Sequence, residues 1–296
     1  MLCDNKISIN FAFANKSNRD LENRRTFMKH FLYVLVGIGL LTACSPFQKA
    51  LKVDDSAYKN EIADQLYEKG KYKQAIRLYE QIEHKEGWAP NYQSMFYKFS
   101  KSYYNAGKWE VAGPMLQRFN SLYFNSPNRE ETLYLEAMAA YELSENYTLD
   151  QHITYEAINK FETFLTAYPE AENATEAQKY LKELNEKLEK KAYEAARLYN
   201  KIGEYTRDYN AAIVALDNFL KDYPGTVYKT EALYYKFDSA YKLAMNSVYS
   251  KMEERIENAA LLYEDLMAFE PENEYKDEAK KMMDRLNKEL QQFSTK

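Results

Sequence analysis

The side chains that could carry out chemistry are few in this chain, and they form no recognisable catalytic set. Glu80 and His84 lie four residues apart, so both would share one face of a helix and could offer two ligands to a metal ion. No third ligand stands beside them, and a solvated helix end is the simpler explanation. The sequence also contains no HExxH, GxSxG, P-loop or GxGxxG pattern. We therefore predict no catalytic residue, no metal site and no cofactor, and a hydrolase remains only as a third hypothesis.

Cys44 is the cysteine whose surroundings indicate a modification. An uncharged run at residues 31–41 follows the basic residue Lys29, and it is too short for a membrane span, which needs about 20 apolar residues. The run leads into the four residues LTAC at 41–44, which resemble the lipobox of bacterial lipoproteins. That resemblance implies cleavage between Ala43 and Cys44 and acylation of Cys44, palmitate included. The alternatives are a plain signal peptide and a buried strand that happens to contain a cysteine.

The same pattern indicates where the native chain starts. Met28 begins a complete signal by itself, and the residues before it show no helical or strand period. We therefore predict that 1–27 is a mis-called extension, 28–43 a lipoprotein signal peptide and 44–56 a lipid-anchored tether. Ser45 follows the cysteine, and by resemblance to lipoprotein sorting this favours the outer membrane, with the chain facing the periplasm.

The composition favours long helices. The 296 residues include only 8 Gly and 7 Pro, too few for many tight turns, but 28 Tyr. With 29% charged residues and a mean hydropathy of −0.68, the chain is not a polytopic membrane protein. Removal of residues 1–43 takes away six basic residues, three acidic residues and Cys3, which leaves a net charge of −8 and no possible disulfide. An acidic chain of this kind is not expected to bind nucleic acid, and its membrane attachment is predicted to be the lipid alone.

An internal repeat organises the rest of the chain. Three segments share one pattern: an alanine is followed by bulky residues four and seven positions later and by a proline twelve positions later. The segments are 157–169, 212–224 and 259–271. Steps of three and four define one helix face, and the proline ends each helix. A second helix precedes each segment, and Gly70 and Gly107 mark turns between paired helices. Small residues facing large ones in helix pairs of about 34 residues are typical of tetratricopeptide (TPR) repeats.

We therefore predict an all-α, TPR-like α-solenoid of five helix pairs, wound as a right-handed superhelix. Apolar residues at steps of three and four over 172–204, without Gly or Pro until Gly203, predict one long helix that opens repeat 4. Pro114, inside the second helix of repeat 2, is expected to kink or delay that helix. The solenoid is predicted to span 57–296, with repeats at 57–90, 91–127, 129–169, 172–224 and 228–271 and a C-terminal helix at 273–293.

A lipobox followed by five TPR-like helix pairs resembles the BamD family, the lipoproteins of the outer-membrane β-barrel assembly machine. The resemblance covers nearly the whole mature chain and includes the YP endings at 168–169 and 223–224. It implies a non-catalytic scaffold that binds the periplasmic domains of the barrel-forming subunit through its C-terminal repeats. It also implies other assembly lipoproteins as partners and unfolded outer-membrane proteins as clients of the N-terminal repeats. The alternative is another envelope TPR lipoprotein scaffold, in a cell-wall or division complex.

Candidate binding residues follow from the geometry of stacked helix pairs. The first helices of the pairs line the concave face of a solenoid, so their positions turned away from the second helix should face a groove. Tyrosine suits such a groove because it offers apolar area at a small loss of entropy, although these tyrosines could instead pack between repeats. The candidate client groove comprises Asn60, Asp64, Tyr67, Tyr97, Lys101 and Tyr104, and the equivalent candidate partner-docking positions are Tyr235, Ser239 and Lys242.

Overall fold

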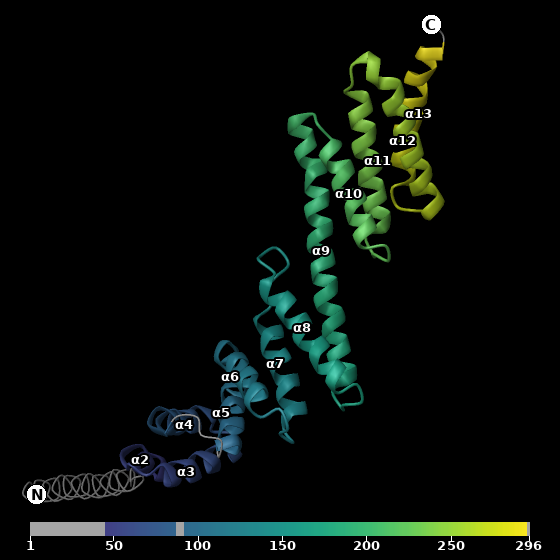
Figure 1. Ribbon diagram of the computed structural model, residues 1–296. Helices are drawn as coiled ribbons and strands as arrows, with labels where there is room; N and C mark the ends of the chain where they lie inside the picture. The colour runs from purple at the N-terminus through teal and green to yellow at the C-terminus, as the bar shows by residue number, and fades with distance from the viewer. Residues whose placement is uncertain (1–44, 87–91, 295–296) are drawn as a thin grey trace, which may run out of the picture. The chain divides into compact units, whose positions relative to one another are not determined.

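The computed structural model describes residues 45–86 and 92–294, and over these residues the regular elements are α-helices with no β-strand (Figure 1). The all-α prediction is therefore confirmed. The chain divides into two compact units at Gly107 and Lys108, and each is described by itself as the N-terminal unit and the C-terminal unit. The predicted extension, signal peptide and lipidation site, 1–44, lie outside the described residues.

The described residues of the N-terminal unit form four helices. They are α2 (Pro46–Lys52), α3 (Ser56–Glu68), α4 (Tyr72–Glu86) and α5 (Gln93–Asn105). Helix α4 packs against both α3 and α5, and α3 also contacts α5. The turn between α3 and α4 passes through Gly70, whose φ of 68° lies in the left-handed region that glycine reaches without steric cost. The helix–turn–helix pair predicted for the first repeat is thus present as α3 and α4.

Helix α2 lies inside the segment 44–56, which was predicted as a tether outside the solenoid. The Ser45 hydroxyl accepts a hydrogen bond from the backbone N–H of Gln48 at 3.3 Å, and Pro46 occupies the first helical position, where its missing N–H costs nothing. Phe47 and Ala50, three residues apart on one face, are buried, and α2 packs against α3 and α4. The segment predicted as a tether therefore contains a packed helix close to the predicted lipidation site.

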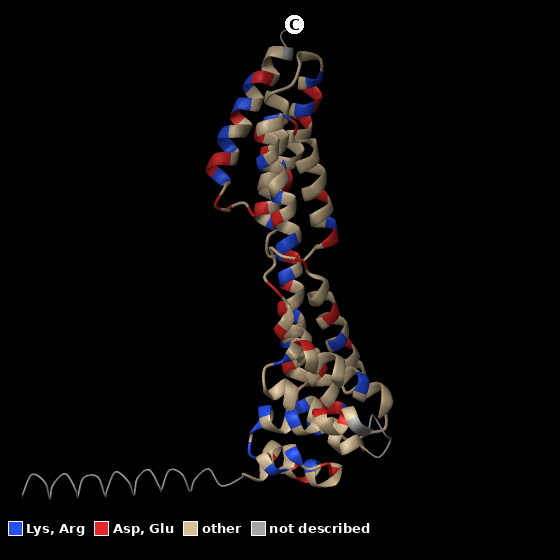
Figure 2. Ribbon diagram, turned by 90° about the vertical axis from the view of Figure 1, so that its left-hand side faces the viewer, with Lys and Arg blue, Asp and Glu red and all other residues tan. Residues whose placement is uncertain are grey.

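The C-terminal unit contains eight helices in the described chain. They are α6 (Trp109–Leu122), α7 (Arg129–Leu143), α8 (His152–Ala167), α9 (Ala174–Thr206), α10 (Asn210–Asp222), α11 (Lys229–Met245), α12 (Tyr249–Phe269) and α13 (Lys276–Ser294). Each helix of this unit packs against the next one along the chain. Figure 2 shows both signs of charge along α13, whose buried residues Ala279 and Leu286 join the core formed with α11 and α12.

Helix α9 is the long helix predicted for 172–204. Its 33 residues extend about 50 Å, so it can contact two groups of neighbours. Tyr180 near its start packs on aromatic rings of α7 and α8, whereas Tyr193 farther along stacks on Tyr228 and packs against Phe219 of α10. A Cβ on Gly203 would lie 2.4 Å from the ring of Tyr209, so only glycine fits where the chain returns from α9 into α10.

Pro114 does not delay the second helix of predicted repeat 2. Helix α6 starts five residues before it at Trp109 and continues through it to Leu122. The residue before a proline is normally pushed out of the helical region by a clash that involves its own Cβ. Here that residue is Gly113, which has no Cβ, and this relieves the clash.

The repeated alanine and bulky positions form the core of the helix pairs. Ala157, Phe161 and Phe164 of α8 are each 0% exposed, and their counterparts Ala212 and Leu216 of α10 are also 0% exposed. The period of three and four residues thus identified the buried face of these helices correctly.

Many tyrosines occupy the seams between helices and donate their hydroxyls to carboxylates of a neighbouring helix. Tyr134 and Tyr141 of α7 donate to Glu176 and Glu183 of α9, each at 2.8 Å. In the N-terminal unit, Tyr103 of α5 donates in the same way to Glu80 of α4 at 2.5 Å. A buried tyrosine ring stabilises the seam while its hydroxyl keeps a polar partner. The packing explanation of the tyrosine excess is confirmed for these residues.

We expect these seams to lose stability at alkaline pH. Burial, followed by the hydrogen bond to Glu183, raises the pKa of Tyr141 to about 12, and burial raises that of Tyr193 to about 12 against the opposing effect of Arg197. The pKa of an unfolded tyrosine is about 10, so this stabilisation is complete below pH 10 and is lost as the pH rises from about 10 to about 12. Urea-unfolding midpoints measured across this range should fall, and fall less in Tyr141→Phe; a midpoint constant to about pH 12 contradicts the expectation.

Candidate functional site

The six residues of the candidate client groove lie on two helices of the N-terminal unit that contact each other. Asn60, Asp64 and Tyr67 are on α3, and Tyr97, Lys101 and Tyr104 are on α5. All six are partly exposed. The structure therefore brings together residues from two predicted repeats on adjacent first helices.

Asp64 is the electrostatic centre of this surface. Its carboxylate accepts hydrogen bonds from the hydroxyl of Tyr79 at 2.6 Å and from the ammonium of Lys98 at 2.9 Å. Lys98 Nζ also lies 3.6 Å from Glu68 and 5.8 Å from the ring centre of Tyr67. Burial lowers the pKa of Lys98, but the hydrogen bond and charge of Asp64 outweigh it and the pKa is raised, so the group stays cationic. The acidic residue and the lysine are consequently held as a fixed pair.

Lys98 was not among the predicted groove residues. It follows Asp64 by 34 residues, which is one TPR period, so complementary charges at equivalent positions of successive repeats were the signal that could have identified it. The predicted cation Lys101 instead accompanies Tyr97 on its own helix. Lys101 Nζ donates to the Tyr97 hydroxyl at 3.0 Å and lies 5.1 Å from the centre of that ring. The surface thus presents two lysines beside aromatic rings.

The predicted partner-docking triad is only partly available at the surface. Ser239 is 0% exposed, accepts a hydrogen bond from Asn200 of α9 at 2.8 Å and donates to the backbone of Tyr235. It is a packing residue at the contact of α9 with α11, not a docking residue, because the long helix α9 covers this position. Lys242 is partly exposed and pairs with Asp238 at 2.7 Å. Tyr235 and Lys242 remain the docking candidates.

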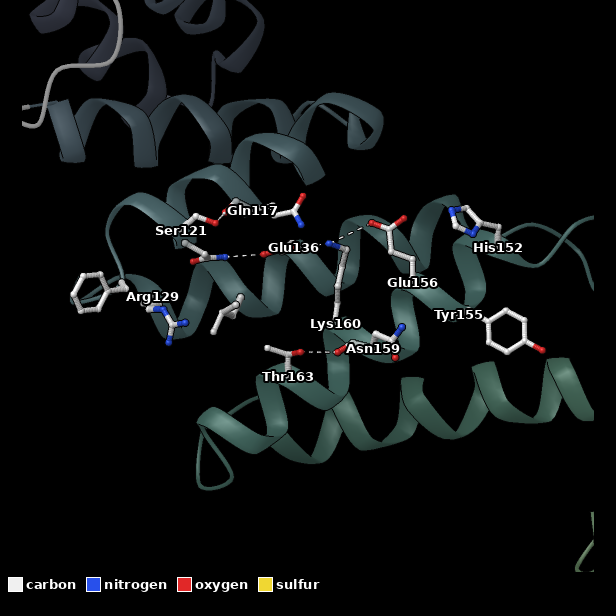
Figure 3. A pocket seen from close by; sticks show the side chains of 13 residues that line it. Gln117, Ser121, Arg129, Glu136, His152, Tyr155, Glu156, Asn159, Lys160 and Thr163 are labelled. Carbon is white, nitrogen blue, oxygen red and sulfur yellow. Dashed lines mark hydrogen bonds and ion pairs between the residues drawn. The ribbon is translucent and has the colours of Figure 1, made fainter.

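A pocket that the sequence did not indicate lies over α7 between α6 and α8 (Figure 3). Its volume is about 960 Å³. Gln117 and Ser121 come from α6, whereas Asn159 and Thr163 come from α8. The pocket thus combines the second helices α6 and α8 with the first helix α7, and none of its lining residues belongs to the predicted groove.

A buried charge pair forms the base of this pocket. Glu136 of α7 accepts a hydrogen bond from Lys160 of α8 at 2.6 Å and another from the Asn120 amide of α6 at 2.8 Å. Glu156 lies 3.2 Å from the same Lys160. Burial lowers the pKa of Lys160, but Glu136 and then Glu156 more than compensate and the pKa is raised. This polar network joins three helices and satisfies both oxygens of the buried carboxylate.

The other residues singled out in the sequence are the predicted cleavage and lipidation residues and the possible metal ligand His84. Ala43 and Cys44 lie outside the described residues, so the cleavage and lipidation sites stay predictions. His84 is exposed at the end of α4, and within residues 45–86 and 92–294 no group of three or more His, Cys, Asp or Glu side chains could hold a metal ion. The helices of the described chain include none long and apolar enough to cross a bilayer.

Within each unit, helices pack against their neighbours in chain order and bury alanines beside large side chains, and this arrangement defines the class of TPR-like helical-repeat proteins. Residues 52–254 match the family model YfiO, described as outer membrane lipoprotein, and the chain belongs to this family. It is 24% identical over 200 residues to the outer membrane protein assembly factor BamD of Caulobacter vibrioides. That match covers 68% of this chain and 62% of the relative's length.

Among solved structures the chain is similar to TPR proteins. TPR-like repeats of a Podosopora anserina putative kinesin light chain match with 16% identity and a TM-score of 0.32, over 71% of this chain and 95% of that one. The TPR2AB domain of yeast Sti1, described as a complex with pHSP90, matches with 14% identity and a TM-score of 0.34. That match covers 78% of this chain and 98% of that one.

Proposed function

We propose that this protein is a non-catalytic lipoprotein scaffold that takes part in the assembly of β-barrel proteins into the outer membrane. The observation that carries the proposal is the match of residues 52–254 to an outer membrane lipoprotein family. The similarity to an outer membrane protein assembly factor supports the role in assembly. In this proposal the chain is held by lipid on Cys44 at the periplasmic face of the outer membrane. Binding, and not turnover, is its activity.

We assign a different binding partner to each of the two surfaces described above. Unfolded outer-membrane proteins bind the groove on α3 and α5, where Tyr97 and Tyr104 offer apolar area and Lys101 offers positive charge. The barrel-forming subunit, through its periplasmic domains, docks near Tyr235 and Lys242 on α11, and other assembly lipoproteins join the same complex. A peptide that carries both aromatic and acidic groups is the chemistry that this groove fits.

Depletion of the protein in cells tests the proposal. The amounts of β-barrel proteins in the outer membrane should fall, and the purified protein should recover a barrel protein with periplasmic docking domains from membrane extracts. Unchanged barrel levels would refute the assembly role. Recovery of peptidoglycan enzymes in place of a barrel protein would instead favour the alternative scaffold of a cell-wall or division complex.

The lipid anchor is tested by Cys44→Ala. We expect the variant to keep its signal peptide uncut, to lack bound acyl chains and to leave the outer-membrane fraction. Metabolic labelling with a palmitate analogue and fractionation of the membranes measure this. A Cys44→Ala protein that still incorporates the label and remains in the outer membrane would exclude lipidation at this residue.

The client groove is tested by Tyr97→Ala and Tyr104→Ala. Aromatic contacts often dominate peptide interfaces, so each replacement should weaken the binding of an unfolded outer-membrane protein about tenfold or more. Tyr205→Ala is the matched control, because Tyr205 is 89% exposed on α9, outside the N-terminal unit. Equal affinity of all three variants and the original protein would show that Tyr97 and Tyr104 only pack.

A further inference from the structure

The pocket over α7 contains a guanidinium group that forms no ion pair with the described residues. Arg129 lies at the start of α7 and lines the pocket with its guanidinium group. Its Nε is buried without a hydrogen-bond partner, and no carboxylate among the described residues forms an ion pair with it. The terminal nitrogens of this guanidinium form no hydrogen bond or ion pair with the other residues of the pocket, so they can donate to an acceptor from outside the chain.

The other charged groups of the pocket are already engaged. Glu136 accepts from both Lys160 and Asn120, and Glu156 lies 3.2 Å from Lys160. The one further titratable side chain with a basic nitrogen in the lining is His152, which is exposed. Arg129 is therefore the charged group of this lining that forms no ion pair, and Figure 3 shows it apart from the Lys160–Glu156 pair.

The rest of the lining suits a peptide chain. Side-chain amides of Gln117 and Asn159 can pair with backbone groups, since an amide both donates and accepts. Phe124 and Tyr155 are 65% and 55% exposed, so their rings offer apolar area to an occupant. Phe124 lies in the short connection between α6 and α7 that leads to Arg129, which places an aromatic ring close in sequence to the unpaired cation.

We propose that this pocket binds the carboxylate of an extended peptide segment of a partner protein, with Arg129 as its anchor. The planar guanidinium donates two parallel hydrogen bonds to a carboxylate, a geometry that a lysine does not reproduce. The site goes beyond the proposed client groove, since all of its lining residues lie in the C-terminal unit, whereas the groove lies on α3 and α5. The carboxylate can come from a chain terminus or from an Asp or Glu side chain.

Fluorescence anisotropy with the purified full-length chain in detergent tests the proposal. Three labelled peptides of the same length are used: one with a free C-terminal carboxylate, one amidated and without acidic residues, and one amidated with a single internal Glu. The first or the third should bind, or both, and the amidated neutral peptide should bind at least tenfold more weakly, about the effect of one charge-assisted contact. Which peptide binds identifies the source of the carboxylate.

Variants assign the binding to Arg129. Arg129→Gln should lower the affinity for the carboxylate peptides about tenfold and leave that for the neutral peptide unchanged. Lys182→Gln is the control, because it removes one positive charge from an exposed site on α9 in the same unit. Phe124→Glu replaces an exposed residue, so it should fold, and its own carboxylate should compete for Arg129 and weaken binding as well.

Two results would overturn the proposal. One is equal binding of the neutral and carboxylate peptides, or no binding of any of them. The other is an unchanged affinity for the carboxylate peptides in both Arg129→Gln and Phe124→Glu. Because the assay uses purified protein and does not depend on barrel assembly in cells, its failure is distinguishable from failure of the proposed scaffold role.

Discussion

Replacing Phe161 with alanine is expected to lower the free energy of unfolding of the chain by about 4 kcal/mol. Phe161 is 0% exposed in α8 and packs against Tyr134 and Tyr141 of α7 and Tyr180 of α9, with ring centres 5.8–6.5 Å apart. Truncation to alanine removes the apolar surface that three helices share and leaves a cavity that these large rings can fill only in part. Urea unfolding followed by circular dichroism measures the loss.

The effect of Phe161→Ala should also be local. In helical-repeat proteins each helix pair contacts only its neighbours, so amide hydrogen exchange should quicken in α7, α8 and the first half of α9 before it does in α12 and α13. Phe124→Ala is the matched control, because Phe124 is 65% exposed and its truncation opens no cavity. If the two variants lost the same small amount of stability, the three-helix aromatic cluster would not be the core that the packing indicates.

Glu136→Ala is the second large expected effect, with a loss of about 3 kcal/mol in the free energy of unfolding. The side chain of Glu136 is 7% exposed and that of Lys160 is 13% exposed. Removal of the carboxylate leaves the Lys160 ammonium with Glu156 alone and leaves the Asn120 amide without its acceptor. A buried charge that loses its partner keeps the full cost of its desolvation, and this is the source of the loss.

A double variant separates the cost of an unpaired charge from the value of the pair itself. Glu136→Leu combined with Lys160→Met removes both charges and should restore most of the stability, because an apolar pair of similar volume often replaces a buried ion pair without loss. Glu186→Ala is the exposed control, since the Lys182–Glu186 pair lies at 3.7 Å with side chains 78% and 56% exposed and should contribute little. A double variant less stable than Glu136→Ala would contradict this explanation.

The site residues that could be predicted were those defined by position within a helix. Counting positions turned away from the paired helix gave Asp64, Tyr97 and Tyr104, and these lie on adjacent first helices of the N-terminal unit. The same rule wrongly placed Ser239 at the surface, because α9 is longer than an ordinary first helix and covers this residue. Periodicity describes one helix and its nearest partner, but it does not describe a third helix that arrives from elsewhere in the chain.

The sequence by itself determined the class of fold and the buried face of the helices that carry the repeated alanine and bulky positions. Local steps of three and four residues, glycine turns such as Gly70 and closing prolines depend only on residues close together in the chain, and these local rules act in the folded protein as they do in an isolated helix. The recurrence of alanine and bulky positions then implied helix pairs. These local rules did not predict helix α2 within the tether segment, because α2 is buried only against the surfaces of α3 and α4.

Only the tertiary structure decided which polar groups meet. Glu136 is buried between Asn120 and Lys160 of two other helices, and Arg129 stays without a partner among the described residues. The charge state and availability of such groups depend on burial and on atoms within about 4 Å, which sequence spacing does not reveal. For that reason the long tyrosine-rich seams could be expected from the chain, whereas the pocket at Arg129 could not.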